Sequence, residues 1–169
     1  MIEENKSEIK EILIFFLKLS ILSGILYIIS QNVNFYYFQR FTAERVYDFL
    51  GLIDISAEIE GVRLVVEEIN FLITEDCTAW KGIFFFFALL ISSKKKLKEV
   101  GKGLLVGIPA LYSLNLLRIL LLISSNIWFG SAAYGILHDL LWNLTMILAV
   151  IALWRMWTKR TNFLTEENN

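Results

Sequence analysis

Three side chains with complementary chemistry stand far apart in this sequence. Cys77 is the only cysteine, His138 is the only histidine, and Arg118 lies in the apolar stretch "SLNLLRILLLI". A thiolate is the attacking form of cysteine, and nearby cations stabilise it. Imidazole titrates near neutrality, so His138 can take the thiol proton and return it to a leaving amine, whereas Arg118 keeps its charge and can stabilise a thiolate or an oxyanion. These residue types predict a cysteine acyl-transfer site.

Polar neighbours of the three residues are candidates for supporting roles. Asn115 precedes Arg118 by one helical turn on the same face, so it could orient Arg118 or a substrate carbonyl. Glu75 and Asp76 flank the thiol. They could bind a cation or orient His138, and a solvated acidic loop end is the alternative interpretation.

The composition predicts that these residues are positioned by membrane-spanning helices. Of the 169 residues, 56% are hydrophobic, the mean hydropathy is +0.58 and there is one proline. A net charge of −1 gives no electrostatic case for nucleic acid, and a single cysteine cannot form an internal disulfide. The start, "MIEENKSEIKEILIFF", is acidic where a cleavable signal peptide is basic, so we expect the first apolar segment to be retained.

Four apolar stretches are candidates for crossing a hydrocarbon core, which takes about 20 helical residues. They are residues 11–30, 78–95, 103–125 and 132–154. The apolar part of the second stretch ends at Ser93 and is short by itself, so we expect it to borrow residues up to Lys95 or from the segment before Thr78. The predicted fold is an all-α, four-span membrane protein forming one domain over residues 1–169.

The charges of the connecting segments predict the orientation of these spans. Five lysines occur in "KKKLKEVGK" between the second and third spans, whereas segment 31–76 has nine acidic residues against three arginines. By the positive-inside rule, both termini and the lysine loop face the cytoplasm and segment 31–76 is extracytoplasmic. Within it, "FTAERVYDFLGLI" has helical spacing with Thr42 as the N-cap, and residues 54–76 predict two or three short strands.

Counting along the spans places the three chemical residues at one depth. Cys77 is 17 residues from Lys94, Arg118 is 16 from Lys102, and His138 is 17 from Arg155. At 1.5 Å per helical residue, all three lie roughly 24–26 Å above the cytoplasmic boundary. We therefore expect them to meet near the extracytoplasmic surface.

Each of these residues also has a purely structural interpretation. A lone cysteine is often a small core residue, an arginine inside a span can snorkel to the interface, and a membrane histidine can be a packing residue. The alternative function is a non-enzymatic membrane subunit or assembly factor with a structural polar cluster. A metal held by Cys77, His138 and Asp76 is disfavoured because Arg118 would repel the cation. We expect no cofactor.

The motifs "TEDCTAWKG", "NLLR" and "ILHD", preceded by "GVRLVVEEINFLI", resemble the exosortase/archaeosortase family over residues 40–155. The compact length and the Ile, Lys and Glu usage are more similar to an archaeosortase. One departure is the thiol box, which in the family is usually Cys-Ser-Gly or Cys-Thr-Gly. Here Cys77 is followed by Thr78 and Ala79.

The resemblance implies a multi-pass cell-membrane enzyme with Cys77, Arg118 and His138 as catalytic residues on the extracytoplasmic side. Family members are proposed to be thiol transpeptidases. Their substrates are proteins whose C-terminal sorting signal consists of a short motif, a transmembrane helix and a basic tail. The implied partners are these substrate proteins and an amine-bearing membrane lipid as acyl acceptor.

Overall fold

The protein was examined as a computed structural model that describes residues 2–93, 96–140 and 144–166, with side chains over 9–93, 96–130 and 144–159. The elements, in chain order, are α1 (Ile2–Ser30), α2 (Tyr36–Leu52), β1 (Ala57–Glu60), β2 (Arg63–Val66), β3 (Ile69–Leu72), the 3₁₀ turn η1 (Glu75–Thr78), α3 (Trp80–Ser92), α4 (Leu97–Leu140) and α5 (Met146–Glu166). The fold is mostly helical with one small sheet, as the sequence predicts.

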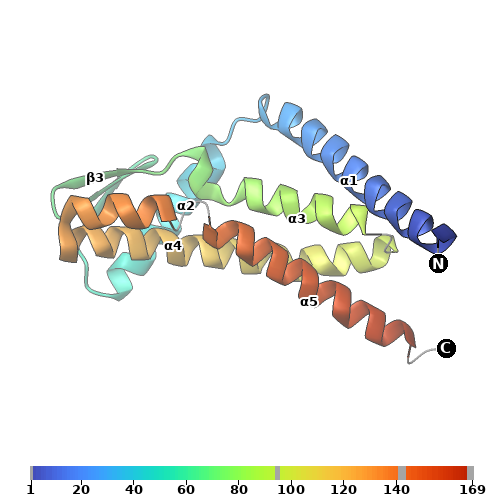
Figure 1. The fold of residues 1–169 in the computed structure, drawn as a ribbon. Coiled ribbons are helices and arrows are strands. Elements are labelled where there is room, and N and C mark those ends of the chain that lie inside the picture. Colours follow the sequence, from blue (N-terminus) through green and yellow to red (C-terminus); the bar gives the residue numbers. More distant parts are fainter. Residues whose placement is uncertain (1, 94–95, 141–143, 167–169) are drawn as a thin grey trace.

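Helix α3 is the centre of the helical part and contacts α1, α4 and α5 (Figure 1). Its apolar residues Phe86 and Leu90 are buried with Leu111 of α4 and Val150 of α5. The approach of α3 to α4 is close: a Cβ added at Gly107 would lie 2.1 Å from a ring carbon of Phe86. Only glycine at this position therefore accommodates the Phe86 ring.

The three strands form an antiparallel sheet in the order β1-β2-β3. Gly61, with φ +63°, is the first central residue of the β1–β2 turn, which suits a type II′ hairpin. Glu67 and Glu68 have φ values of 47° and 69° at the β2–β3 turn, as a type I′ hairpin requires. Both two-residue turns fix the register of the sheet.

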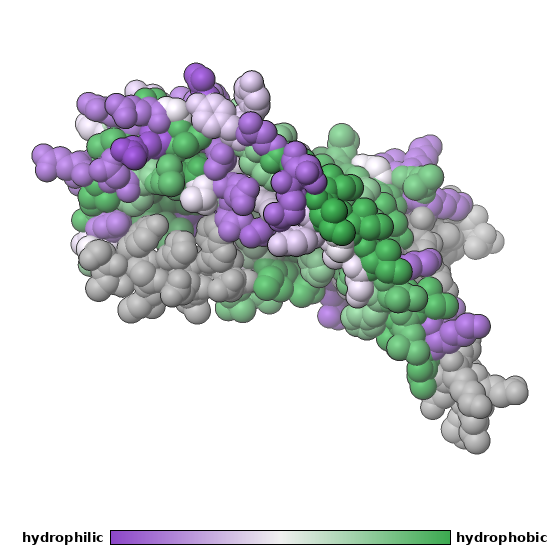
Figure 2. Space-filling view, turned by 90° about the horizontal axis from the view of Figure 1, so that it is seen from above, coloured by the Kyte–Doolittle hydropathy of each residue, from purple (hydrophilic) through white to green (hydrophobic). Residues whose placement is uncertain are grey.

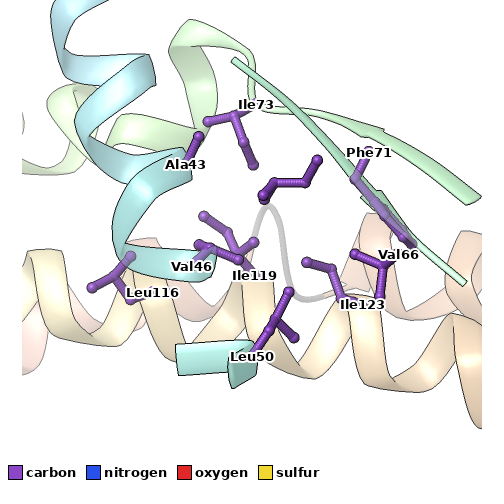
Figure 3. Packing of buried hydrophobic residues seen from close by; sticks show 10 residues of the cluster. Ala43, Val46, Leu50, Val66, Phe71, Ile73, Leu116, Ile119 and Ile123 are labelled. Carbon is purple, nitrogen blue, oxygen red and sulfur yellow. The ribbon is translucent and has the colours of Figure 1, made fainter. Parts of the chain in front are cut away.

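A second hydrophobic core holds the sheet against α2 and α4. Val46 and Leu50 of α2 meet Val66 of β2 and Ile119 and Ile123 of α4, and Figure 3 shows these side chains converging. The core anchors the sheet to the long helix that carries Arg118. The relative positions of the strands and α4 are therefore fixed by apolar packing.

The three strands agree with the prediction, but the start of the preceding helix does not. Helix α2 begins at Tyr36, so Thr42 lies inside the helix, where it is buried. The side chain of Asn34 accepts a hydrogen bond from the Tyr36 N–H at 2.9 Å and satisfies one free donor at the helix start. Thr42 as the N-cap was wrong because tertiary burial extended the helix beyond the apolar pattern.

Among the described residues, two helical segments are long and apolar enough to cross a membrane: Ile9–Ser30 and Leu97–Gly130. The second predicted span appears as the 13-residue α3, shorter than the roughly 20 residues that a full crossing takes. The fourth, 132–154, corresponds to the end of α4 and the start of α5, with residues 141–143 outside the described part. The count of four spans stays a prediction.

The two ends of the molecule differ in character. Figure 1 shows both ends of the chain and the start of α4 at one end, with the sheet and α2 at the other. Hydrophobic side chains cover α1, where Leu13 is 64% exposed, while hydrophilic ones gather towards the sheet (Figure 2). An apolar exposed helix beside a polar cap is the pattern of a protein in lipid.

Candidate active site

Cys77 lies in η1, at the junction between the sheet and α3. Its N–H donates to the Thr74 carbonyl at 3.0 Å, and its Sγ is 3.5 Å from the Thr74 hydroxyl. Thr78 closes the turn by donating its hydroxyl to the Glu75 carbonyl at 2.7 Å. Ala79, in the left-handed region with φ 62°, then redirects the chain into α3. The thiol is thus half-buried in a turn and not within a span.

Asn115 of α4 ties that turn to the long helix. It is completely buried, and its Nδ2 donates to the Cys77 carbonyl at 2.5 Å. The hydrogen bond joins residues 38 positions apart and fixes the height of the thiol relative to α4. Asn115 therefore contacts the backbone of the nucleophile candidate, a partner that helical spacing did not indicate.

Arg118 lies one turn further along α4 and is 4% exposed. Its guanidinium interacts electrostatically with Cys77 and Asp76. A buried charge is tolerated only beside compensating groups, so this placement ties Arg118 to the thiol region. The structure brings Cys77 and Arg118 together, although they are 41 residues apart in the sequence.

The two acidic candidates separate in the structure. Asp76 pairs with Lys81 of α3 at 2.5 Å, whereas Glu75 is exposed at the start of the turn. Among the residues whose side chains are described, no group of three or more His, Cys, Asp or Glu side chains could hold a metal ion. Of the two carboxylates, Asp76 is the one that acts on the charge of Arg118.

His138 belongs to the part of α4 that follows Gly130, and its side chain lies outside the described part of the structure. Gly130 has φ 78° and ψ 179°, so the helix breaks there. Figure 1 shows residues 131–140 (orange) running back from this break towards the start of α5. The meeting of His138 with Cys77 stays a prediction.

Two cavities meet at Asp76 and Arg118. The first, which we call the strand-edge groove, has a volume of about 560 Å³. It is lined by residues 69–74 of β3 and its extension, by Asp76, Cys77 and Arg118, and by Ile119, Leu122 and Asn126 of α4.

The second, which we call the helix cavity, has a volume of about 420 Å³ and lies among α3, α4 and α5. Its apolar walls include Phe85, Met146 and Val150, and its polar residues include Asp76 and Arg118. The thiol region is thus reached by one groove along the sheet and by one apolar cavity among the helices.

Comparison with protein-family models matches residues 10–155 to the family described as transmembrane exosortase (Exosortase_EpsH). The match covers most of the 169 residues and includes Cys77, Arg118 and His138. The chain belongs to the transmembrane exosortase family. The resemblance inferred from the short motifs is thereby confirmed.

Exosortases as a family are membrane transpeptidases of the cysteine type that act on proteins with C-terminal sorting signals. Family membership and the two apolar helices both point to a membrane location for this exosortase. Searches of curated proteins and of solved structures gave no significant match.

Two features of the exosortase site were missed by sequence reasoning. One is the Asn115–Cys77 hydrogen bond, for which a buried amide within an apolar helix was the only signal. The other is the strand-edge groove, because the sequence does not show which edge of the sheet faces α4.

Proposed function

We propose that this exosortase is a cysteine transpeptidase that cleaves C-terminal sorting signals through a thioester on Cys77. The observation that carries the proposal is the shared groove of Cys77 and the buried Arg118, in a chain of the exosortase family. A thiol beside a guanidinium shielded from water has the environment that activates cysteine nucleophiles.

In the proposed reaction, His138 takes the thiol proton of Cys77 as Sγ attacks the scissile carbonyl, and Arg118 stabilises the oxyanion that develops on the carbonyl oxygen. The C–N bond then breaks while the C–S bond remains, and the amine leaves with a proton supplied by His138. An acceptor amine next attacks the thioester and gives its proton to His138, and the thiolate leaves. His138 then returns this proton to the thiolate, which restores the starting thiol.

Asn115 and Asp76 are positioning residues in this proposal. Asn115 holds the Cys77 backbone, so it sets the distance from Sγ to Arg118. Asp76 offsets the charge of Arg118 and holds Lys81. Glu75 is exposed, and a supporting role for it stays a prediction.

We place the acyl acceptor, an amine-bearing membrane lipid, in the helix cavity. Its apolar walls suit an acyl chain, and its polar end at Asp76 and Arg118 lies where a head group must reach the thioester. Water is the competing acceptor, and the product of the reaction, free acid or lipid amide, distinguishes them by mass.

We further propose that the sheet end faces outward and that both termini are cytoplasmic. The support is the positive-inside rule applied to the lysine loop, together with the gathering of both chain ends opposite the sheet (Figure 1). A substrate anchored by its own transmembrane helix then presents its motif at the level of the groove.

The proposed function is tested by Cys77→Ala, co-expressed with a substrate bearing a sorting signal. We expect processing to fall on the order of 10³-fold or more, because the nucleophile is removed. Ser92→Ala makes a change of similar size at the opposite end of α3 and serves as the control. Processing by a well-inserted Cys77→Ala variant at the wild-type rate would refute the proposal.

A further inference from the structure

Strand β3 is an edge strand whose outer edge faces the strand-edge groove. All six consecutive residues 69–74 line that groove. Side chains of successive strand residues point to opposite faces of a sheet, so a cavity under one face would contact only alternate residues. Because every residue from 69 to 74 lines the cavity, we infer that the cavity runs along the outer backbone edge of β3.

The register identifies which peptide groups point into the groove. Ile73 N–H donates to the Val62 carbonyl at 2.9 Å, on the β2 side. In an antiparallel ladder the direction alternates along the strand, so the N–H and C=O groups of Phe71 also point to β2, and those of Asn70 and Leu72 point away from it. The type I′ turn at Glu67 and Glu68 requires the same alternation of peptide groups that point towards β2 and away from it.

These outward groups lack hydrogen bonds within the described residues. Neither the N–H nor the C=O of Asn70 or Leu72 has a partner on the outer edge in that part of the chain. Edge strands are normally protected by charged residues or proline, yet residues 69–74, "INFLIT", contain neither. Within the part of the chain whose side chains are described, this edge of β3 is thus without pairing or a charged guard, and such an edge beside a half-buried thiol is suited to pairing with another strand.

The groove is also lined by side chains of α4, which a bound segment could contact. They include Ile119, Leu122 and Asn126, two apolar residues and one amide. Cys77 and Arg118 also line the groove. A segment lying in it would therefore have its backbone against β3, its alternate side chains against α4 and one peptide bond at the thiol.

We propose that the substrate binds by strand addition: the extended segment that precedes its transmembrane helix pairs with β3 as a fourth strand and so brings the scissile carbonyl to Cys77. This inference rests on the proposed function, because it specifies how the peptide reaches that nucleophile. Backbone hydrogen bonds supply affinity in this mode, and pockets for alternate side chains supply specificity.

The test removes single outward N–H groups from β3. Leu72→Pro and Asn70→Pro delete a donor that the sheet does not use, and proline is tolerated on an edge strand when its N–H would face outward. We expect each to lower kcat/KM for a substrate that the wild type processes by about tenfold or more. Alkylation of Cys77 by iodoacetamide reports whether the site is intact.

Ala57→Pro is the matched control. Ala57 lies on β1, the other edge strand, and by the same alternation its N–H points away from β2 and from the groove. We expect it to retain kcat/KM within about twofold. Equal kcat/KM for the β3 proline variants and Ala57→Pro would overturn strand addition.

A second measurement uses the wild-type enzyme and does not depend on the folding of any variant. Synthetic peptides of the substrate segment carry one N-methyl group at successive positions upstream of the scissile bond. Strand addition predicts that every second N-methyl lowers the rate about tenfold or more while the intervening ones have little effect. Rates without this alternation would overturn the inference. Absence of Cys77-dependent processing in the wild type would instead refute the proposed function.

Discussion

Cys77 is held by its own turn and by a helix that approaches from another part of the chain. Thr74 binds its N–H and approaches its Sγ, and Asn115 binds its carbonyl. Arg118, one turn beyond Asn115, is thereby set at a fixed position relative to the thiol. In the proposed site, the position of the thiol relative to Arg118 thus depends on this buried amide together with the apolar core that holds the sheet against α4.

Replacing Asn115 with Ala should therefore affect both stability and processing. The substitution leaves the buried Cys77 carbonyl without its donor, which costs about 1–3 kcal/mol of unfolding free energy. It also frees the thiol turn to move relative to Arg118, so kcat should fall while the amount of inserted protein is maintained. Thermal unfolding in detergent and the kcat of processing measure the two effects.

Asn115→Asp is the informative companion variant, because it keeps the shape but cannot donate from its carboxylate. It should impair processing as Ala does. An Asn115→Asp enzyme with wild-type stability and kcat would contradict the positioning role.

The proximity of Cys77 and Arg118 could be predicted from the number of residues that separates each of them from the basic end of its span. The position of Asn115 against the Cys77 backbone could not, because it depends on how far α4 is rotated against η1. Sequence spacing gives a face of one helix but not the element packed on that face. His138 as the acid/base stays a prediction.

At the scale of elements, α3 links the thiol turn to the helical core. Its residue Phe86 fills the space over Gly107 of α4, and Ala79 bends the chain between η1 and α3. A displacement of α3 is therefore transmitted directly to Cys77. The strands could be predicted from Ile/Val alternation around Gly61, but the extent of α2 could not, because burial of Thr42 overrides its capping tendency.

Gly107→Ala tests the contact between α3 and α4. The new Cβ would lie 2.1 Å from the Phe86 ring, so the helices must separate, which costs about 1–3 kcal/mol of stability. Gly101→Ala is the control on the same helix, because nothing lies within 4 Å of its added Cβ. Thermal unfolding in detergent should show a lower midpoint for Gly107→Ala alone.

Combination with Phe86→Leu completes this test. The smaller side chain should restore part of the midpoint lost in Gly107→Ala, since it makes room for the methyl group. Equal midpoints for the two alanine variants would show that the close approach does not limit stability.

At the scale of the whole molecule, apolar and polar surfaces separate along the long axis. The exposed apolar face of α1 suits lipid, whereas hydrophilic side chains gather towards the sheet, which leads into the thiol turn (Figures 1 and 2). The membrane location could be predicted from hydropathy, because it follows from the high fraction of hydrophobic residues in the chain. The lengths of individual spans could not be predicted, because α3 is stabilised by the helices around it and is shorter than a free span must be.

The most direct test of the account is isolation of the covalent intermediate on Cys77. Purified enzyme is mixed with a substrate, quenched in acid and digested, and the peptide containing Cys77 is analysed by mass spectrometry. The proposed mechanism predicts that this peptide carries the upstream substrate fragment through a thioester that neutral hydroxylamine cleaves. Continued turnover with an unmodified Cys77 peptide at every quench time, and undiminished turnover by Cys77→Ala, would contradict it.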